Sequence, residues 1–117
     1  MLRWTMLCLF ILAPSAGHGF EKLQDKDDLL AALNGRALTM GLFNLSLVLG
    51  EDGSITGSAM GWGVTGAWRW QDDLFCREID WSGMPIAANC QLVEAAGDKM
   101  RFTSDAGQGQ SAVFTLR

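Results

Sequence analysis

Apolar and polar residues alternate with a period of two along most of the chain after Gly35. This alternation is typical of strands that bury one face and expose the other. The pattern predicts strands at residues 45–49, 55–60, 66–70, 74–81, 88–94, 99–103 and 112–117. Turn-forming residues separate several of them, at 51–54, 72–73, 96–98 and 106–109.

One segment before these strands has helical periodicity. Residues 25–35 predict a short helix with Asp25 as its N-cap and with Asn34-Gly35 as its stop. Acidic residues in the first turn would stabilise the positive end of the helix dipole. The helix presents an apolar stripe that must pack on another element, formed by Leu29, Leu30 and Leu33.

Short strands joined by tight turns leave no room for crossover helices, so neighbouring strands are expected to be antiparallel. We therefore expect a mainly β fold, a small antiparallel meander that forms a barrel or half-barrel, with one short N-terminal helix. Trp, Phe and Leu side chains on one face of the meander would fill its interior.

The start of the chain has the features of a signal peptide over residues 1–17. Arg3 gives a positive beginning, residues 6–12 are apolar, and residues 13–17 are mostly small. The apolar run is well short of the ~20 residues that span a bilayer, which favours a cleaved signal over a membrane anchor. Cleavage would leave residues 18–117 as a single β-domain, periplasmic or secreted from a bacterium.

Two cysteines remain after this cleavage, Cys76 and Cys90. An even number of cysteines in an exported protein predicts a disulfide. Closing the loop between them would contribute about 3 kcal/mol to stability by the chain-entropy estimate. A redox pair usually sits two residues apart, and two thiolates without a nearby histidine make a poor zinc site, so both alternatives are weaker.

Charge and histidine content exclude several classes of function. The formal net charge is −4 at pH 7, and loss of Arg3 with the leader makes it −5. An acidic surface disfavours nucleic acid and, once the signal is cleaved, membrane partners. The single histidine, His18, lies at the cleavage point, so no Ser–His or Cys–His pair can be assembled. We expect no catalytic residues, no metal and no cofactor.

The best candidate for a ligand-binding surface is a set of aromatic residues with two arginines. It consists of Trp62, Trp68, Trp70, Trp81, Arg69 and Arg77. Aromatic walls with a few polar groups are what the mouth of a barrel offers a small ligand. The alternative is that the tryptophans pack in the core, with Trp68 and Trp70 on one strand face and Arg69 on the other.

Two further patterns have a chemical and a structural interpretation. Residues 61–66 match the letters of the dinucleotide fingerprint G-x-G-x-x-G, but a strand pattern follows them, which favours a bulge or a thinned sheet. Glu78 and Asp80 share a strand face and could form an acid pair, although a solvated face is the more common arrangement.

The order of these motifs resembles that of a group of short exported bacterial β-domain proteins of unknown function. The resemblance is carried by Asn34-Gly35, residues 61–70, Phe75-Cys76-Arg77, Asn89-Cys90 and Phe102-Thr103-Ser104-Asp105. Members are sometimes labelled dihydrodipicolinate reductase, which implies a cytoplasmic, nicotinamide-dependent enzyme of two domains. The present chain differs from that description in length, in its export signal and in its single histidine.

These patterns together predict a non-enzymatic periplasmic domain that binds a small ligand or an envelope protein. The alternative is an enzyme, either a reductase that uses the glycine motif or a hydrolase that uses Glu78 and Asp80. A purely structural accessory protein is a third possibility.

Overall fold

The computed structural model describes residues 19–117. The predicted signal peptide, residues 1–17, and His18 lie outside the described residues. The helical elements are α1 (Lys26–Leu33) and the short 3₁₀ turns η1 (Gly41–Phe43) and η2 (Asp105–Gly107). The strands are β1 (Glu21–Lys22), β2 (Leu38–Met40), β3 (Leu45–Leu49), β4 (Ser54–Ala59), β5 (Trp62–Gln71), β6 (Leu74–Trp81), β7 (Met84–Ala96), β8 (Lys99–Thr103) and β9 (Ser111–Leu116).

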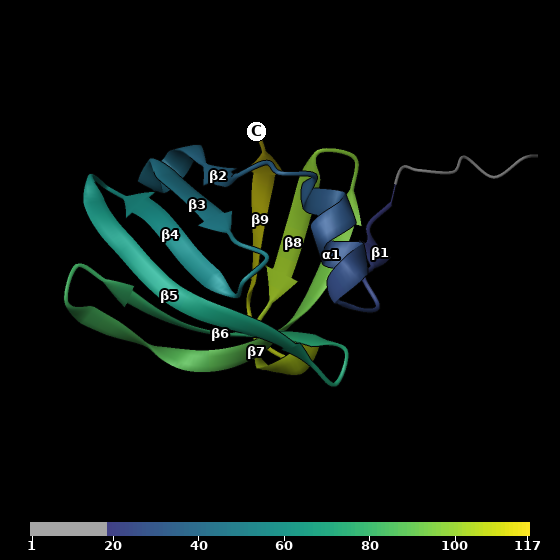
Figure 1. The fold of residues 1–117 in the computed structure, drawn as a ribbon. Helices are drawn as coiled ribbons and strands as arrows, with labels where there is room; N and C mark the ends of the chain where they lie inside the picture. The colour runs from purple at the N-terminus through teal and green to yellow at the C-terminus, as the bar shows by residue number, and fades with distance from the viewer. Residues whose placement is uncertain (1–18) are drawn as a thin grey trace, which may run out of the picture.

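Strands β2 to β9 form a closed antiparallel barrel (Figure 1). Each strand pairs with its neighbour in sequence, and β2 pairs with β9 to complete the circle. The short β1 adds to the C-terminal part of β7, where Glu21 pairs with Ala95. The predicted meander is confirmed, and it closes into a barrel rather than a half-barrel.

Three of the hairpins turn through a pair of residues with positive φ. These pairs are Met60-Gly61, Asp72-Asp73 and Ser82-Gly83. Two left-handed residues in succession match the twist of the flanking strands, which is why such turns are common in hairpins. Glycine at the second position lowers the steric cost in two of the three turns.

Two strands are longer than their alternation predicts. β5 begins at Trp62 rather than at residue 66, and β7 begins at Met84 rather than at residue 88. Each extension contains a residue type that is depleted in strands, Gly63 in β5 and Pro85 in β7, so neither extension has a clear strand pattern in the sequence. Gly66 is required by close packing, because a Cβ there would collide with the carbonyl oxygen of Glu78.

The strand β2 was not predicted, because residues 38–40 are too few to show a period. It nevertheless closes the barrel, with Leu38 opposite Leu47 of β3 and Leu116 of β9.

The helix α1 covers one end of the barrel. Asp25 caps it as predicted, since its Oδ1 accepts a hydrogen bond from the Asp28 backbone N–H at 2.8 Å. Its Leu29 and Leu33 are buried in the core. Lys26 Nζ donates to the Glu51 carbonyl oxygen at 3.1 Å, which places α1 at the end where β3 turns into β4.

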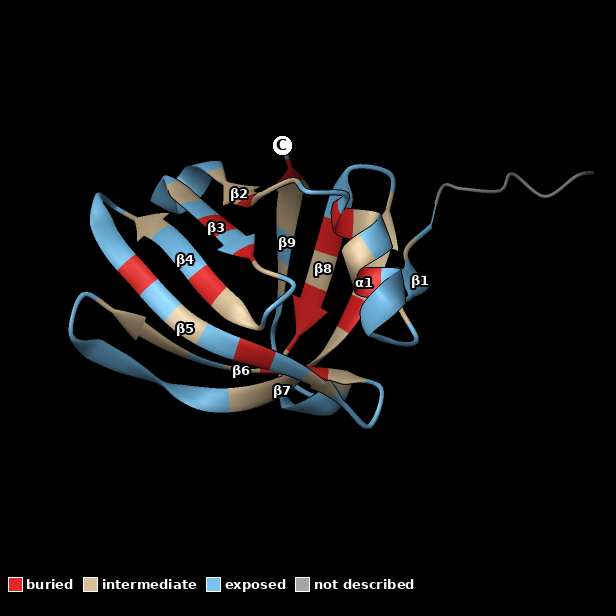
Figure 2. Ribbon diagram, in the orientation of Figure 1, coloured by how far each residue is buried: buried red, intermediate tan, exposed pale blue. Residues whose placement is uncertain are grey.

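The core lies inside the barrel, as Figure 2 shows by the buried bands that alternate with exposed ones along β3 and β5. Aromatic rings form a chain across it. Trp68 and Phe75 are stacked with centroids 5.5 Å apart, and Phe102 contacts Phe75 at 5.1 Å and Phe114 at 5.4 Å. Trp68 lies at the end of this chain nearest α1, beside Lys26.

Candidate functional site: an open barrel interior

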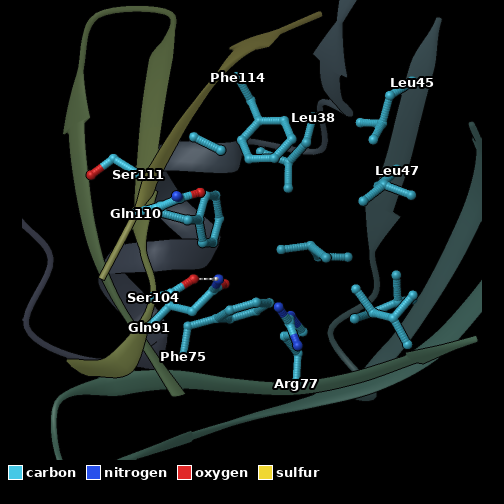
Figure 3. A pocket seen from close by; sticks show the side chains of 15 residues that line it. Leu38, Leu45, Leu47, Phe75, Arg77, Gln91, Ser104, Gln110, Ser111 and Phe114 are labelled. Carbon is cyan, nitrogen blue, oxygen red and sulfur yellow. Dashed lines mark hydrogen bonds between the residues drawn. The ribbon is translucent and has the colours of Figure 1, made fainter. Parts of the chain in front are cut away.

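A cavity of about 340 Å³, here called the barrel cavity, lies inside the barrel (Figure 3). Its volume is within the range usual for small-molecule sites, about 300–1,000 Å³. Its apolar walls come from strands on every side of the barrel. They consist of Leu38, Leu45, Leu47, Leu49, Ile55, Phe75, Ile79, Phe102, Ala112 and Phe114.

Polar groups gather on one side of the barrel cavity. They are Arg77, Gln91, Ser104, Gln110 and Ser111. Figure 3 shows Gln91, Ser104 and Gln110 on one wall, opposite Leu45 and Leu47, with Arg77 pointing into the space between. The hydroxyl of Ser111 points away from this space and lies 2.7 Å from Thr103 Oγ1. Gln91 Nε2 donates to Ser104 Oγ at 3.2 Å, which ties β7 to the end of β8.

Arg77 is held in this position by an irregularity in β7. The pairing of β6 with β7 shifts register between Arg77 and Ile79, which forms a bulge opposite them. The guanidinium donates from Nη1 to the carbonyl oxygen of Ala87, in the bulged segment, at 2.7 Å. Burial lowers the pKa of Arg77, because removal from water disfavours its charged form.

A second hollow of about 250 Å³, the apolar pocket, adjoins the barrel cavity. All of its lining side chains are apolar: Phe43, Leu45, Leu47, Ala59, Met60, Val64, Ile79, Trp81 and Ile86. Leu45, Leu47 and Ile79 line both hollows, so the two lie next to each other. Trp81 is fixed in this wall because its Nε1 donates to the Ala59 carbonyl oxygen at 3.1 Å.

Large apolar side chains are exposed around the end of the barrel that α1 does not cover. This apolar rim consists of Leu42, Phe43, Met60, Trp62, Met84 and Ile86. Leu42 is 81% exposed and Trp62 is 61% exposed, although both are large apolar residues. An exposed apolar group of this kind is typical of a binding entrance or an interaction surface.

Three of the predicted site residues lie at the two hollows or at the apolar rim. Arg77 lines the barrel cavity, Trp81 lines the apolar pocket, and Trp62 stands on the apolar rim. The other three lie elsewhere. Trp68 is buried near α1, where Lys26 Nζ lies 5.3 Å from its ring centroid.

Trp70 and Arg69 lie close to the turn between β5 and β6. Trp70 is half-buried, and its Nε1 has no hydrogen-bond partner within residues 19–117. Arg69 is exposed and points away from the interior, where its Nε donates to Gln71 Oε1 at 2.9 Å. Neither residue lines either hollow.

The polar wall was not predicted from the sequence. Gln91 lies two residues before the buried Val93 on β7, and Ser104 lies two residues after the buried Phe102. Because side chains two residues apart on a strand share a face, these spacings place Gln91 and Ser104 on the inner face, and this was the signal from which the polar wall could have been predicted.

The patterns with a possible catalytic interpretation do not form a site in the interior, where Val64 alone of these residues lines the apolar pocket. Gly61 is in the turn between β4 and β5, and the rest of residues 61–66 belongs to β5, which continues to Gln71. Glu78 and Asp80 are on the outer face of β6, where they line a shallow depression. The Oδ2 of Asp80 accepts a hydrogen bond from the Gly83 N–H at 2.8 Å.

The predicted disulfide is confirmed. Cys76 and Cys90 face each other across β6 and β7, with their sulfur atoms 2.06 Å apart. Arg77 and Gln91 follow them on the opposite face of the same strands, so the bond cross-links the wall that carries both residues.

The part of the chain that the structure describes contains no group of three or more His, Cys, Asp and Glu side chains placed to hold a metal ion. None of its helices is long and apolar enough to cross a bilayer.

The fold and the hollows define the class of this protein as a small closed antiparallel β-barrel, covered at one end by a helix. Comparison of the chain with family models, with curated proteins and with solved structures finds no match.

Proposed function

We propose that this domain is a non-enzymatic carrier or receptor for a small, largely apolar molecule bound inside the barrel. The observation that carries the proposal is the pair of adjoining hollows, about 340 and 250 Å³, lined by apolar side chains with a few polar groups on one wall. This composition is the usual one for a ligand site.

The cost of the hollows supports the same conclusion. A domain of about 100 residues has a thin margin of stability, and side chains that line an empty space lose packing contacts. The aromatic chain from Trp68 to Phe114 shows that this sequence packs large side chains closely in the interior, yet three of its rings still border the barrel cavity. An unfilled cavity with an exposed apolar rim favours a ligand as its occupant.

We further propose that the protein acts outside the cytoplasm, in the periplasm or after secretion. The disulfide between Cys76 and Cys90 supports this location, because such bonds persist in oxidising compartments. The signal-peptide pattern at residues 1–17 supports it independently.

A neutral dye that fluoresces in apolar surroundings, N-phenyl-1-naphthylamine, tests the binding proposal. We expect saturable binding to the wild-type protein. Ala112→Trp places a large ring on the inner wall and should weaken binding by roughly tenfold or more, since it occupies the barrel cavity. Val113→Trp, on the adjacent and exposed position of β9, is the matched control and should bind as the wild type does.

Either of two results would contradict the proposal: absence of saturable dye binding to the folded wild-type protein, or equal affinity of the two tryptophan variants. Thermal melting of both variants establishes that they are folded.

The apolar rim favours a second candidate function, the binding of an envelope protein. Six large apolar side chains at one end of the barrel form a surface that a protein partner could cover. In that case a protein cross-linked to the wild type in periplasmic extract should be lost with Trp62→Ser and retained with Val113→Ser. Equal recovery with the two variants would exclude the rim as the contact surface.

A further inference from the structure

The barrel interior carries one formal charge, and its sign is opposite to that of the whole protein. Arg77 is the only Arg, Lys, Asp or Glu among the residues that line the barrel cavity and the apolar pocket. The chain as a whole has a net charge of −4. A positive group therefore lies inside an acidic protein.

Within residues 19–117, Arg77 has no acidic partner. The only ion pair in this part of the chain joins Arg101 to Glu94, on β8 and β7, with 2.9 Å between Nε and Oε1. Burial lowers the pKa of Arg77, because removal from water disfavours the charged guanidinium. A partly buried charge without a counter-ion is unfavourable unless a partner is supplied.

The guanidinium has hydrogen-bonding capacity to spare. It presents five N–H donors in a planar fork, and one bond, from Nη1 to the Ala87 carbonyl oxygen, is formed at 2.7 Å. That bond fixes the orientation of the side chain. Figure 3 shows the guanidinium nitrogens inside the cavity, whose lining also includes Gln91 and Ser104.

The two hollows differ in polarity: one has a polar wall and the other has none, which suits a molecule with one polar and one apolar end. Polar groups lie on one wall of the barrel cavity, whereas the lining of the apolar pocket consists of apolar side chains alone. Leu45, Leu47 and Ile79 line both hollows and form the boundary between them. A molecule that occupies both hollows would place one end beside Arg77 and the other end near the apolar rim.

We infer that the ligand is an amphipathic monocarboxylate, whose carboxylate pairs with Arg77 and whose hydrocarbon chain lies in the apolar pocket. The inference rests on the proposed ligand-binding function and names the chemical class of the ligand. A carboxylate matches the planar fork of a guanidinium through two parallel hydrogen bonds. A single negative charge balances the single positive charge of the interior.

Three probes with the same ten-carbon chain test this inference: decanoate, 1-decanol and decyltrimethylammonium. Each probe is titrated into the dye-loaded wild-type protein at neutral pH, at concentrations below those at which the probe forms micelles. The displacement of N-phenyl-1-naphthylamine gives the affinity of the probe. We expect decanoate to bind roughly tenfold or more tightly than decanol, since hydrogen bonds to charged groups are the stronger ones. Decyltrimethylammonium should bind most weakly, because its charge is repelled by Arg77.

Substitutions at two arginines assign the preference to a residue. Arg77→Gln should reduce the affinity for decanoate to that for decanol and leave the affinity for decanol unchanged. Arg77→Lys keeps the charge and should restore part of the preference. Arg69→Gln removes a positive charge from the outer face of the neighbouring strand β5 and should leave the preference intact.

The failure of this inference is distinguishable from the failure of the proposed function. Equal affinities of the wild type for decanoate and decanol would overturn the head-group inference and leave ligand binding standing. Absence of dye binding would overturn both. A decanoate preference that survives Arg77→Gln would overturn the assignment to Arg77. The comparison of probes on the wild type does not depend on the folding of any variant.

Discussion

At the scale of single residues, the close approach of β5 and β6 requires a glycine at one position of β5 and not at another. Gly66 faces the backbone of β6, and a Cβ at this position would collide with the Glu78 carbonyl oxygen. Gly63 lies on the same strand, yet a Cβ there would have no heavy atom within 4 Å. The two glycines of β5 therefore differ in the space around them.

This contrast predicts different effects of the same substitution. Gly66→Ala should lower the free energy of unfolding by about 1–3 kcal/mol, since the two strands must move apart. Gly63→Ala, the matched control, should change it by less than about 0.5 kcal/mol, as surface substitutions usually do. Chemical denaturation monitored by tryptophan fluorescence measures both values. Equal destabilisation would show that close approach of the strands is not the reason for glycine at position 66.

At the scale of elements, the β6–β7 hairpin combines a turn, a disulfide and a bulge in one wall. Ser82-Gly83 forms the turn, Cys76–Cys90 cross-links the strands, and the bulge supplies the Ala87 carbonyl that holds Arg77. The cross-link lies next to the residues that line the cavity. Stability and the geometry of the proposed site therefore depend on the same hairpin.

We expect reduction of this disulfide to lower the melting temperature by roughly 12–24 °C. The bond closes a loop of about 15 residues and contributes about 3 kcal/mol, and each kcal/mol shifts the melting temperature of such a domain by about 4–8 °C. Circular dichroism with and without a reductant measures the shift. The double variant Cys76→Ala/Cys90→Ala is the control and should not respond to the reductant. Identical melting curves of the wild type under both conditions would refute the stabilising role of the bond.

At the scale of the whole molecule, the barrel is closed by its shortest ladder. β2 pairs with β9 at Leu38↔Leu116 and Thr39↔Thr115 only. The ladder between β5 and β6, in contrast, runs from Val64↔Trp81 to Gln71↔Leu74. Two further backbone hydrogen bonds, between Ala37 and Arg117, extend this ladder, which still remains shorter than the β5–β6 ladder. Ladders with few hydrogen bonds open at lower cost in free energy than long ones.

Amide hydrogen exchange should therefore be fastest, among the barrel strands, at this closing ladder. We expect peptides that contain residues 38–40 to exchange before peptides that contain residues 64–71, as measured by mass spectrometry. Decanoate should slow exchange at both, because a ligand bound to the folded state reduces opening. Equal protection of the two segments in the ligand-free protein would contradict a weak closing ladder.

Much of the fold could be predicted from local patterns, and the candidate site could be predicted only in part. Alternation correctly assigned Trp68 and Trp70 to one face of β5 and Arg69 to the other. It did not indicate how deep each tryptophan lies along the barrel, and depth separates the buried Trp68 from the exposed Trp62. The polar wall was missed because Gln91 and Ser104 are brought together by the pairing of strands, which no local pattern reveals.

The sequence by itself determined the antiparallel meander, the capped helix and the disulfide, because each depends on residues that are near one another in the chain. Only the tertiary structure decided that the meander closes through β2 and β9 and that its interior keeps two adjoining hollows. Closure joins Leu38 to Leu116, near the two ends of the described chain, and the volume left inside depends on side chains from all the barrel strands at once. These are non-local quantities, so a periodic pattern read along the chain does not contain them.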